Sequence, residues 1–83
     1  MPTVHRAEGM RFVIFVNDHW PAHVHAIKGS GEAKIALGQG EAAPRLAWAR
    51  GMRAADIRQA MTEVAKERAR LRAAWTAIHG ESE

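Results

Sequence analysis

The chain has 83 residues, of which 47% are hydrophobic and 25% are charged, and its formal net charge is +3. This composition is typical of a soluble globular domain and excludes a disordered tail, while the length leaves no room for a second hydrophobic core. The chain has no cysteine, which excludes disulfide bonds, cysteine-based zinc sites and a cysteine nucleophile, and fits a reducing cytoplasm.

The longest apolar run covers residues 12–16, whereas a membrane-spanning helix needs about 20 apolar residues. The first residues also lack the apolar core of a signal peptide. We therefore expect a cytoplasmic protein with no membrane partner. Because a domain of this size buries only about 60% of the surface of its unfolded chain, we also expect that a second subunit stabilises it, for example in a homodimer.

Five short segments have the composition of β-strands and are separated by turn-forming residues. They cover residues 3–6, 11–16, 23–27, 32–37 and 45–49. The second segment is apolar on both faces, which predicts the central strand of a sheet. Alternation in the last segment predicts that Leu46 and Trp48 both point inward. Residues 1–50 are thus predicted to form an antiparallel meander of four to five short strands.

Residues 53–79 are predicted to form one long C-terminal helix packed across the sheet, because apolar residues recur there at helical spacing. Such a helix is about 39 Å long, whereas six-residue strands reach about 20 Å. Its end is therefore expected to overhang the sheet, so that Leu71, Trp75 and Ile78 form an interface with a partner. The alternative is that they fold back over the sheet edge. The whole chain, 1–83, is predicted to be a single α+β domain with a frayed tail at 80–83.

Positive charge is concentrated in the second half of the chain, where residues 44–79 carry eight cations and three anions. This excess suits RNA, an acidic protein partner or a solvated helix face. Arg50 and Arg53 flank the predicted helix start and, with Trp20 as a stacking residue, form a predicted phosphate-binding set. Alternatively, the arginines are merely solvated and Trp20 plugs the end of the sheet. Arg68 interrupts the apolar stripe and is expected to meet a carboxylate or a phosphate.

The stretch 17–25, Asn-Asp-His-Trp-Pro-Ala-His-Val-His, holds three of the five histidines. His23 and His25 are two residues apart on a predicted strand, so their side chains leave the same face of the sheet. Val24 and Ala26 then face the core.

Three interpretations of this pair remain open. In the first, His23 and His25 are metal ligands, and Asp18, His19 or His5 supplies a third; the three ligands then converge on one ion. In the second, the two imidazoles are catalytic, acting as general acid and base in RNA cleavage, and both rings lie exposed in an open cleft. In the third, both rings are buried and hydrogen-bonded to the backbone in a purely structural role.

Several segments of the chain together resemble a family of small bacterial proteins that carry a domain of unknown function. The matching segments are Met-Pro-Thr-Val, Arg-Phe-Val-Ile-Phe, Asn-Asp-His-x-Pro-x-His-Val-His, Gly-Glu-Ala-Lys-Ile and a closing Ala-Ala-Trp. The family pattern is (Glu/Asp)-His-x-Pro-Pro-His-(Phe/Val)-His, and Ala22 stands where it has a second proline. By position, the motif residues are Asp18, His19, Pro21, His23 and His25.

The resemblance implies one component of a toxin–antitoxin-like pair, whose cognate partner is a small protein of the same operon. We therefore expect RNA binding or RNA cleavage through the His-x-His site. The alternatives are a non-enzymatic interaction module with structural histidines and a metal-binding protein. Whether the protein is an enzyme stays open, and no cofactor is expected apart from a divalent metal ion at Asp18, His23 and His25.

Overall fold

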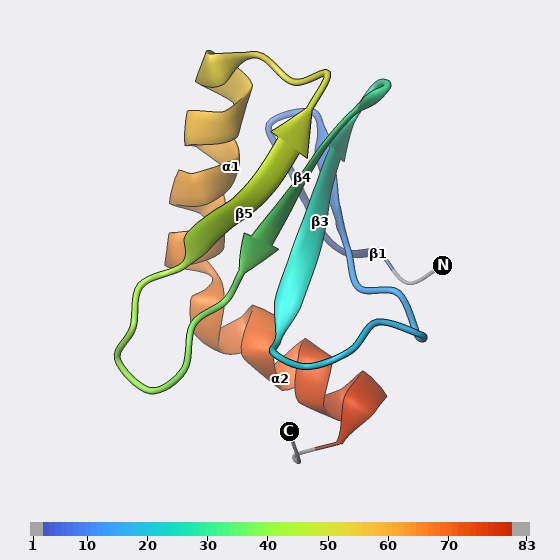
Figure 1. Ribbon diagram of the computed structural model, residues 1–83, viewed down its shortest axis with the longest axis vertical. Helices are drawn as coiled ribbons and strands as arrows, with labels where there is room; N and C mark the ends of the chain where they lie inside the picture. The colour runs from blue at the N-terminus through green and yellow to red at the C-terminus, as the bar shows by residue number, and fades with distance from the viewer. Residues whose placement is uncertain (1–2, 81–83) are drawn as a thin grey trace.

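The computed structural model describes residues 3–80, which form one five-stranded antiparallel sheet and two helices (Figure 1). The elements are β1 (Thr3–Ala7), β2 (Met10–Val13), β3 (His23–Lys28), β4 (Gly31–Ala36), β5 (Arg45–Arg50), α1 (Ala54–Lys66) and α2 (Arg68–His79). Strand order in the sheet follows the sequence. The predicted α+β class and the antiparallel meander are therefore confirmed.

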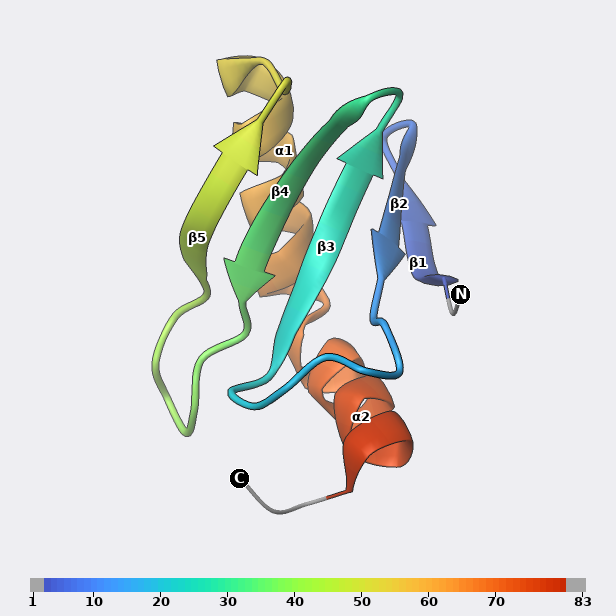
Figure 2. The ribbon, with the colours of Figure 1, turned by 45° about the vertical axis from the view of Figure 1, so that its right-hand side comes forward.

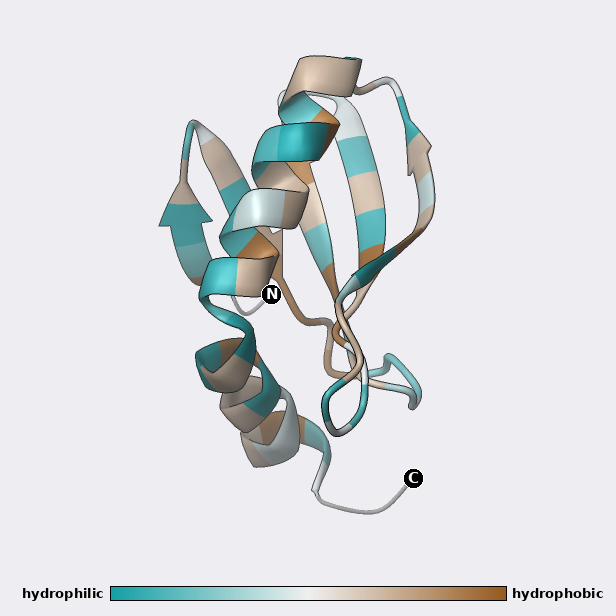
Figure 3. Ribbon diagram, turned by 90° about the vertical axis from the view of Figure 1, so that its left-hand side faces the viewer, coloured by the Kyte–Doolittle hydropathy of each residue, from teal (hydrophilic) through white to brown (hydrophobic). Residues whose placement is uncertain are grey.

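The core lies between one face of the sheet and the two helices. Successive residues along a strand point to opposite faces of the sheet, and the strands in Figure 3 accordingly show bands of hydrophilic and hydrophobic residues. Val24 and Ala26 on β3 are completely buried and pack against helix residues that include Val64. The predicted inward orientation of Val24 and Ala26 is thus confirmed, and the two histidines of β3 lie on the other face.

The prediction of a single long C-terminal helix is wrong, because the chain turns at Glu67 and forms two helices. Glu67 has φ −103° and ψ 15°, outside helical geometry. The turn lets α2 pass beneath one end of the sheet (Figure 1). There Arg68 donates hydrogen bonds to the carbonyl oxygens of Leu37 at 2.6 Å and Gly40 at 2.8 Å. Arg68 therefore ties α2 to the loop after β4, and it forms no ion pair with a carboxylate of residues 3–80.

This turn also removes the predicted overhang. Leu71 and Trp75 have no exposed surface, and Ile78 packs half-buried against the same core. A straight helix would leave these side chains in water, whereas the turn buries them under the sheet end. The expectation of an overhanging interface at Leu71, Trp75 and Ile78 is therefore wrong, and the alternative, in which they fold over the sheet, describes the structure.

The second strand is shorter than predicted and is not central. It ends at Val13 and lies second in the order, whereas β3 occupies the middle. Asp18 explains the early end, because its Oδ2 accepts the Phe15 N–H at 3.1 Å while its own N–H donates to the Phe15 carbonyl at 3.0 Å. This turn takes residues 14–16 out of the strand and leaves Val16 72% exposed.

A β-bulge in β5 changes the orientation of its two large apolar residues. Ile35 pairs with Leu46, but Lys34 pairs with Trp48, so Ala47 is an extra residue on β5. Leu46 therefore lies on the helix side, opposite Ile35, and Trp48 lies on the far side, opposite Lys34. The prediction that both point inward is wrong, and both are 38% exposed.

The end of the chain partly lies outside the described residues. Gly80 ends α2 with a φ of +82°, and the rest of the predicted tail, 81–83, is not described. Within residues 3–80, neither helix is long and apolar enough to cross a bilayer.

Replacing Leu71 with alanine tests the burial of α2. Deleting a fully buried leucine side chain removes packing and leaves a cavity, so we expect the free energy of unfolding to fall by about 2–5 kcal/mol. Urea denaturation monitored by circular dichroism measures the change in the free energy of unfolding. The exposed helical substitution Thr62→Ala is the control and should change stability by less than about 0.5 kcal/mol. Equal stability of the two variants would contradict the burial of α2.

Candidate metal centre

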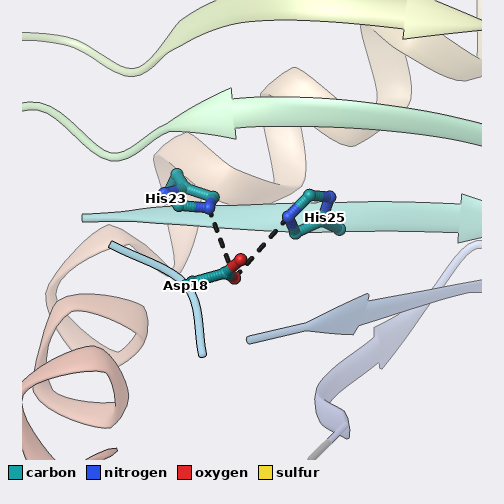
Figure 4. Close-up of side chains that lie close together, drawn as sticks. All are labelled: Asp18, His23 and His25. Carbon is teal, nitrogen blue, oxygen red and sulfur yellow. Dashed lines mark ion pairs between the residues drawn. The ribbon is translucent and has the colours of Figure 1, made fainter. Parts of the chain in front are cut away.

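The candidate site lies where the loop after β2 returns to the start of β3. His23 and His25 project from β3, and Asp18 reaches them from the loop (Figure 4). The two imidazole rings are neighbours, with centroids 5.2 Å apart. Asp18 Oδ2 lies 3.3 Å from His23 Nε2 and 3.6 Å from His25 Nε2. The structure thus brings together the three residues of the metal interpretation.

Hydrogen bonds at the Nδ1 atoms determine which ring nitrogen carries the proton. His23 Nδ1 lies 3.0 Å from the Pro21 carbonyl oxygen, which only accepts. His25 Nδ1 lies 2.9 Å from Oε2 of Glu32, whose ionised carboxylate also only accepts. Both Nδ1 atoms are therefore the protonated donors. In the neutral tautomer, each Nε2 then holds a lone pair directed toward Asp18.

The partners of these residues hold the arrangement in place. Arg50 donates to Oε1 of Glu32 at 3.1 Å, which leaves Oε2 for His25. Asp18 is oriented by the Phe15 N–H, and the Phe15 ring packs edge-on against His25 at 4.9 Å. The side chains of the candidate site are thus fixed by neighbours on three different segments.

The atoms that converge at the candidate centre lack a positive charge or a proton between them. His25 Nε2 is buried and has no hydrogen-bond partner within residues 3–80. With both imidazoles neutral, two lone pairs and a carboxylate oxygen face one another, and three acceptors repel unless a cation or proton lies between them. The pKa of His23 is lowered from 6.5, first by burial and against the opposing influence of the Pro21 carbonyl and the Asp18 charge. The neutral imidazole is therefore the favoured form of His23.

The three interpretations of the histidines make different structural predictions. The side chains of His23 and His25 are only 6% and 10% exposed, which does not match the open acid–base pair. A purely structural pair would have both rings bonded to the backbone. Among residues 3–80, His23 bonds to a backbone carbonyl, whereas His25 bonds to the Glu32 side chain. Ligand atoms of Asp18, His23 and His25 lie within 4.8 Å of one another. This convergence matches the metal interpretation.

A cleft of about 400 Å³ lies next to the candidate centre. Its lining consists of loop residues Asn17, Asp18, His19, Trp20 and Pro21 and sheet residues His23, His25, Lys34, Ala36, Arg45, Ala47 and Trp48. His19, one of the proposed third ligands, is exposed on its wall.

The predicted phosphate-binding set does not come together in this cleft. Arg50 bonds to Glu32 and its guanidinium lies 5.2 Å from the Trp48 ring centroid. Arg53 is absent from the cleft lining and lies 3.9 Å from Asp56. Trp20 lines the cleft while its ring packs edge-on against Trp75 at 5.5 Å, as expected for a plug at the sheet end.

Sequence reasoning missed four residues around the candidate centre: Glu32, Lys34, Arg45 and Trp48. A signal for the first two was available, because a tight turn at 28–31 places Glu32 and Lys34 beside His25 in a hairpin. No comparable signal existed for Trp48, since the bulge that turns it toward the site is not visible in an alternating sequence.

A second group of possible ligands, His5, Glu63 and Glu67, differs from the first in its hydrogen bonds. His5 Nε2 donates to Glu63 at 2.7 Å, and Arg70 donates to His5 Nδ1. Arg70 also pairs with Glu67 at 2.9 Å. Both nitrogens of His5 are therefore occupied, and the carboxylates are already neutralised. This cluster joins β1 to the helix junction and is not a metal site.

Glu63→Gln tests this cluster through its pH dependence. The pKa of Glu63 lies below its usual 4.5, chiefly because His5 donates to it. Its ionised form therefore stabilises the fold fully above about pH 4.5, and the effect disappears as pH falls through the lowered pKa. We expect Glu63→Gln to lose about 1–3 kcal/mol at pH 7 and progressively less as the pH falls below about 4.5.

Chemical denaturation at several pH values measures this difference. Glu41→Gln, in the exposed loop before β5, is the matched control and should show no such trend. A stability loss for Glu63→Gln that stays constant from pH 7 to pH 3 would contradict the assignment.

Comparison with known proteins gives one match. A family model described as "Domain of unknown function (DUF4160)" matches residues 9–76, which include the whole candidate centre. No curated protein and no solved structure matches the chain.

Proposed function

The chain belongs to this family, the domain of unknown function DUF4160, and we propose that it binds a divalent transition-metal ion through Asp18, His23 and His25. The observation that carries the proposal is the convergence of three acceptor atoms, including the buried His25 Nε2 that has no hydrogen-bond partner within residues 3–80. A cation at this point relieves their repulsion. A proton shared by two of the atoms is the alternative, and burial of His23 disfavours its imidazolium form.

The spacing of the ligand atoms supports the proposal. Ligands held at about 2.0–2.1 Å in a tetrahedral arrangement are separated from one another by about 3.3 Å. The two separations from Asp18 Oδ2, 3.3 Å to His23 and 3.6 Å to His25, are close to this value. They are also longer than the usual 2.7–3.2 Å of an N–H···O hydrogen bond.

The groups behind the ligands are those that metal sites use. A ligating imidazole normally donates its second N–H to a carboxylate or a backbone carbonyl, which fixes its tautomer and orientation. Glu32 does this for His25, and the Pro21 carbonyl does it for His23. The Arg50 guanidinium in turn holds Glu32. These bonds support preorganised ligands.

The donor set determines the kind of ion. Two nitrogens and one carboxylate suit Zn²⁺ and its first-row neighbours, whereas Mg²⁺ and Ca²⁺ prefer all-oxygen surroundings. Three protein ligands leave a position for water or a ligand, as in catalytic rather than closed structural zinc sites. Such an ion, when bound, supplies a Lewis acid to a coordinated phosphate or carbonyl oxygen.

The toxin–antitoxin-like pairing and the action on RNA stay predictions that the family resemblance implies. A cognate partner or a second copy of the chain requires an accessible surface. Because Leu71 and Trp75 are buried, the exposed apolar residues Val16 and Leu46 are the better candidates for it. This observation supports the interaction-module alternative, which is compatible with a metal ion in the same molecule.

Titration of metal-free protein with Zn²⁺ in a calorimeter tests the metal proposal. We expect one ion per chain for the wild type and no stoichiometric binding for Asp18→Asn or His25→Ala. The amide introduced by Asp18→Asn keeps an oxygen for the Phe15 N–H, so this variant separates ligand loss from misfolding. His19→Ala, on the cleft wall, is the control and should bind as the wild type does. Wild-type protein that binds no Zn²⁺, Co²⁺ or Ni²⁺ would refute the proposal.

The role of Glu32 gives a separate prediction. Glu32→Gln removes the carboxylate that orients His25 without removing a ligand, so we expect Zn²⁺ affinity to fall by about 10- to 100-fold. Competition with a zinc-sensitive dye measures the affinity. The control is Glu41→Gln, the same chemical change in the exposed loop between β4 and β5. Unchanged affinity in Glu32→Gln would mean that Glu32 does not support the ligand.

A further inference from the structure

The sheet face that carries the histidines is not covered by the helices. Figure 2 shows the sheet in front of α1, with α2 below the lower end of the sheet and the loop after β2 crossing only that end. The strand register assigns residues to this face, because directly paired residues share a side. His25 pairs with Val13 on β2 and with Lys34 on β4.

Two arginines lie directly opposite each other on this face. Arg11 is two residues before Val13 and therefore shares its side, and Arg6 on β1 is the partner of Arg11. Like charges in this position destabilise a sheet. Neither arginine side chain has a hydrogen bond or an ion pair within residues 3–80. An anion bound between them would relieve the repulsion.

The cleft on the other side of the histidines is also cationic. Lys34 and Arg45 line it, and the side chain of neither forms a hydrogen bond or an ion pair within the described part of the chain. Asp18 is the one carboxylate among the cleft residues, while Glu32 nearby is neutralised by Arg50. The cleft is thus positive even before a metal ion adds its charge. Cations therefore flank the candidate centre on both sides.

Trp48 gives this surface a flat aromatic element. The bulge in β5 places it opposite Lys34, and its ring lies 6.1 Å from that of His25. The side chain is 38% exposed and lines the cleft. Exposed aromatic rings among cations are the usual platform for bases of single strands. The cleft volume of about 400 Å³ falls in the range of sites that hold a group of nucleotide size.

We infer that this sheet face binds single-stranded nucleic acid: a base stacks on Trp48, its phosphate lies between the candidate centre and Lys34 and Arg45, and a neighbouring phosphate lies between Arg6 and Arg11. Contact of a phosphate oxygen with a metal ion rests on the proposed function, whereas the cation and indole contacts do not. Five strands spaced about 4.8 Å apart span about 19 Å, a distance that a short oligonucleotide crosses and a mononucleotide does not.

Fluorescence anisotropy with a labelled six-nucleotide single-stranded RNA tests this inference, using intact protein with Zn²⁺ and again with EDTA. We expect Trp48→Leu to weaken binding by about 5- to 150-fold, the effect of losing one stacked base. Lys34→Gln and Arg11→Gln should each reduce the slope of log affinity against log salt by about 0.7. Arg58→Gln removes a positive charge from the exposed side of α1 and is the matched control, with no expected change.

Comparison probes identify the ligand further. AMP should lose affinity in Trp48→Leu but not in Arg11→Gln, because it does not reach the arginine pair. A single-stranded DNA of the same sequence reports whether the 2′-hydroxyl matters. Binding of polyglutamate as tight as that of the RNA, with no effect of Trp48→Leu, would replace the inference with a site for acidic protein.

The two proposals fail in different ways. Zinc binding by the wild type without any RNA binding at low salt would overturn the inference and leave the metal centre intact. RNA binding that depends on Trp48, Lys34 and Arg11 but is equal in Zn²⁺ and EDTA would support the inference and remove the metal ion from it. Thermal melting gives a further check, since Arg11→Gln relieves a like-charge pair and should not lower the melting temperature. This check distinguishes a loss of RNA binding caused by the missing charge from one caused by unfolding.

Discussion

The candidate centre depends on two hydrogen bonds made on the far side of the imidazole rings. Because His23 donates from Nδ1 to a backbone carbonyl and His25 donates from Nδ1 to Glu32, both rings must present their Nε2 lone pairs to the same point. Without these bonds, either ring could turn and satisfy Nε2 elsewhere. With them, Asp18 and the two histidines form a cluster of hydrogen-bond acceptors. The repulsion among these acceptors is relieved by a cation or a proton bound between them.

The surrounding fold contributes to this constraint in three ways. The turn held by Asp18 ends β2 early and brings the carboxylate over β3. The hairpin of β3 and β4 brings Glu32 within reach of His25. The bend at Glu67 directs α2 beneath the sheet end, where Trp75 packs against the His23 ring at 5.0 Å. Trp75 and the loop thereby contribute to the burial of the two histidines, which are only 5% and 8% exposed.

The cluster around His5, in contrast to the candidate centre, has partners for both ring nitrogens of its histidine. It also combines histidine with carboxylate ligand atoms that lie within 4.8 Å of one another, yet Arg70 and Glu63 occupy both nitrogens of His5. A set of carboxylates and a histidine is therefore not by itself a metal site. The presence of cations that already neutralise the acids separates a structural network from a centre that needs an ion.

Much of the secondary structure could be predicted from the sequence, because it depends on local patterns. Alternation and turn residues located all five strands, and the same period of two placed His23 and His25 on one face. The proximity of Asp18 to the two histidines also follows from its place in the short loop before β3. Helical spacing located α1 and α2 but not the break, because Leu71 and Trp75 keep the helical spacing of the apolar stripe on the far side of Arg68.

What the sequence alone determined is thus the meander, the helical region and the identity of the histidine pair. The tertiary structure decided the bend at Glu67, the reversal of Trp48 by the bulge, the carboxylate partner of His25, and the unpaired state of Lys34 and Arg45 within residues 3–80. The physical reason is that each of these features depends on contacts between segments distant in the chain. The local periodicity of the sequence does not reveal that a strand contains an extra residue, and so it does not predict which face the following side chains take. It also does not reveal which charged side chains pair after folding.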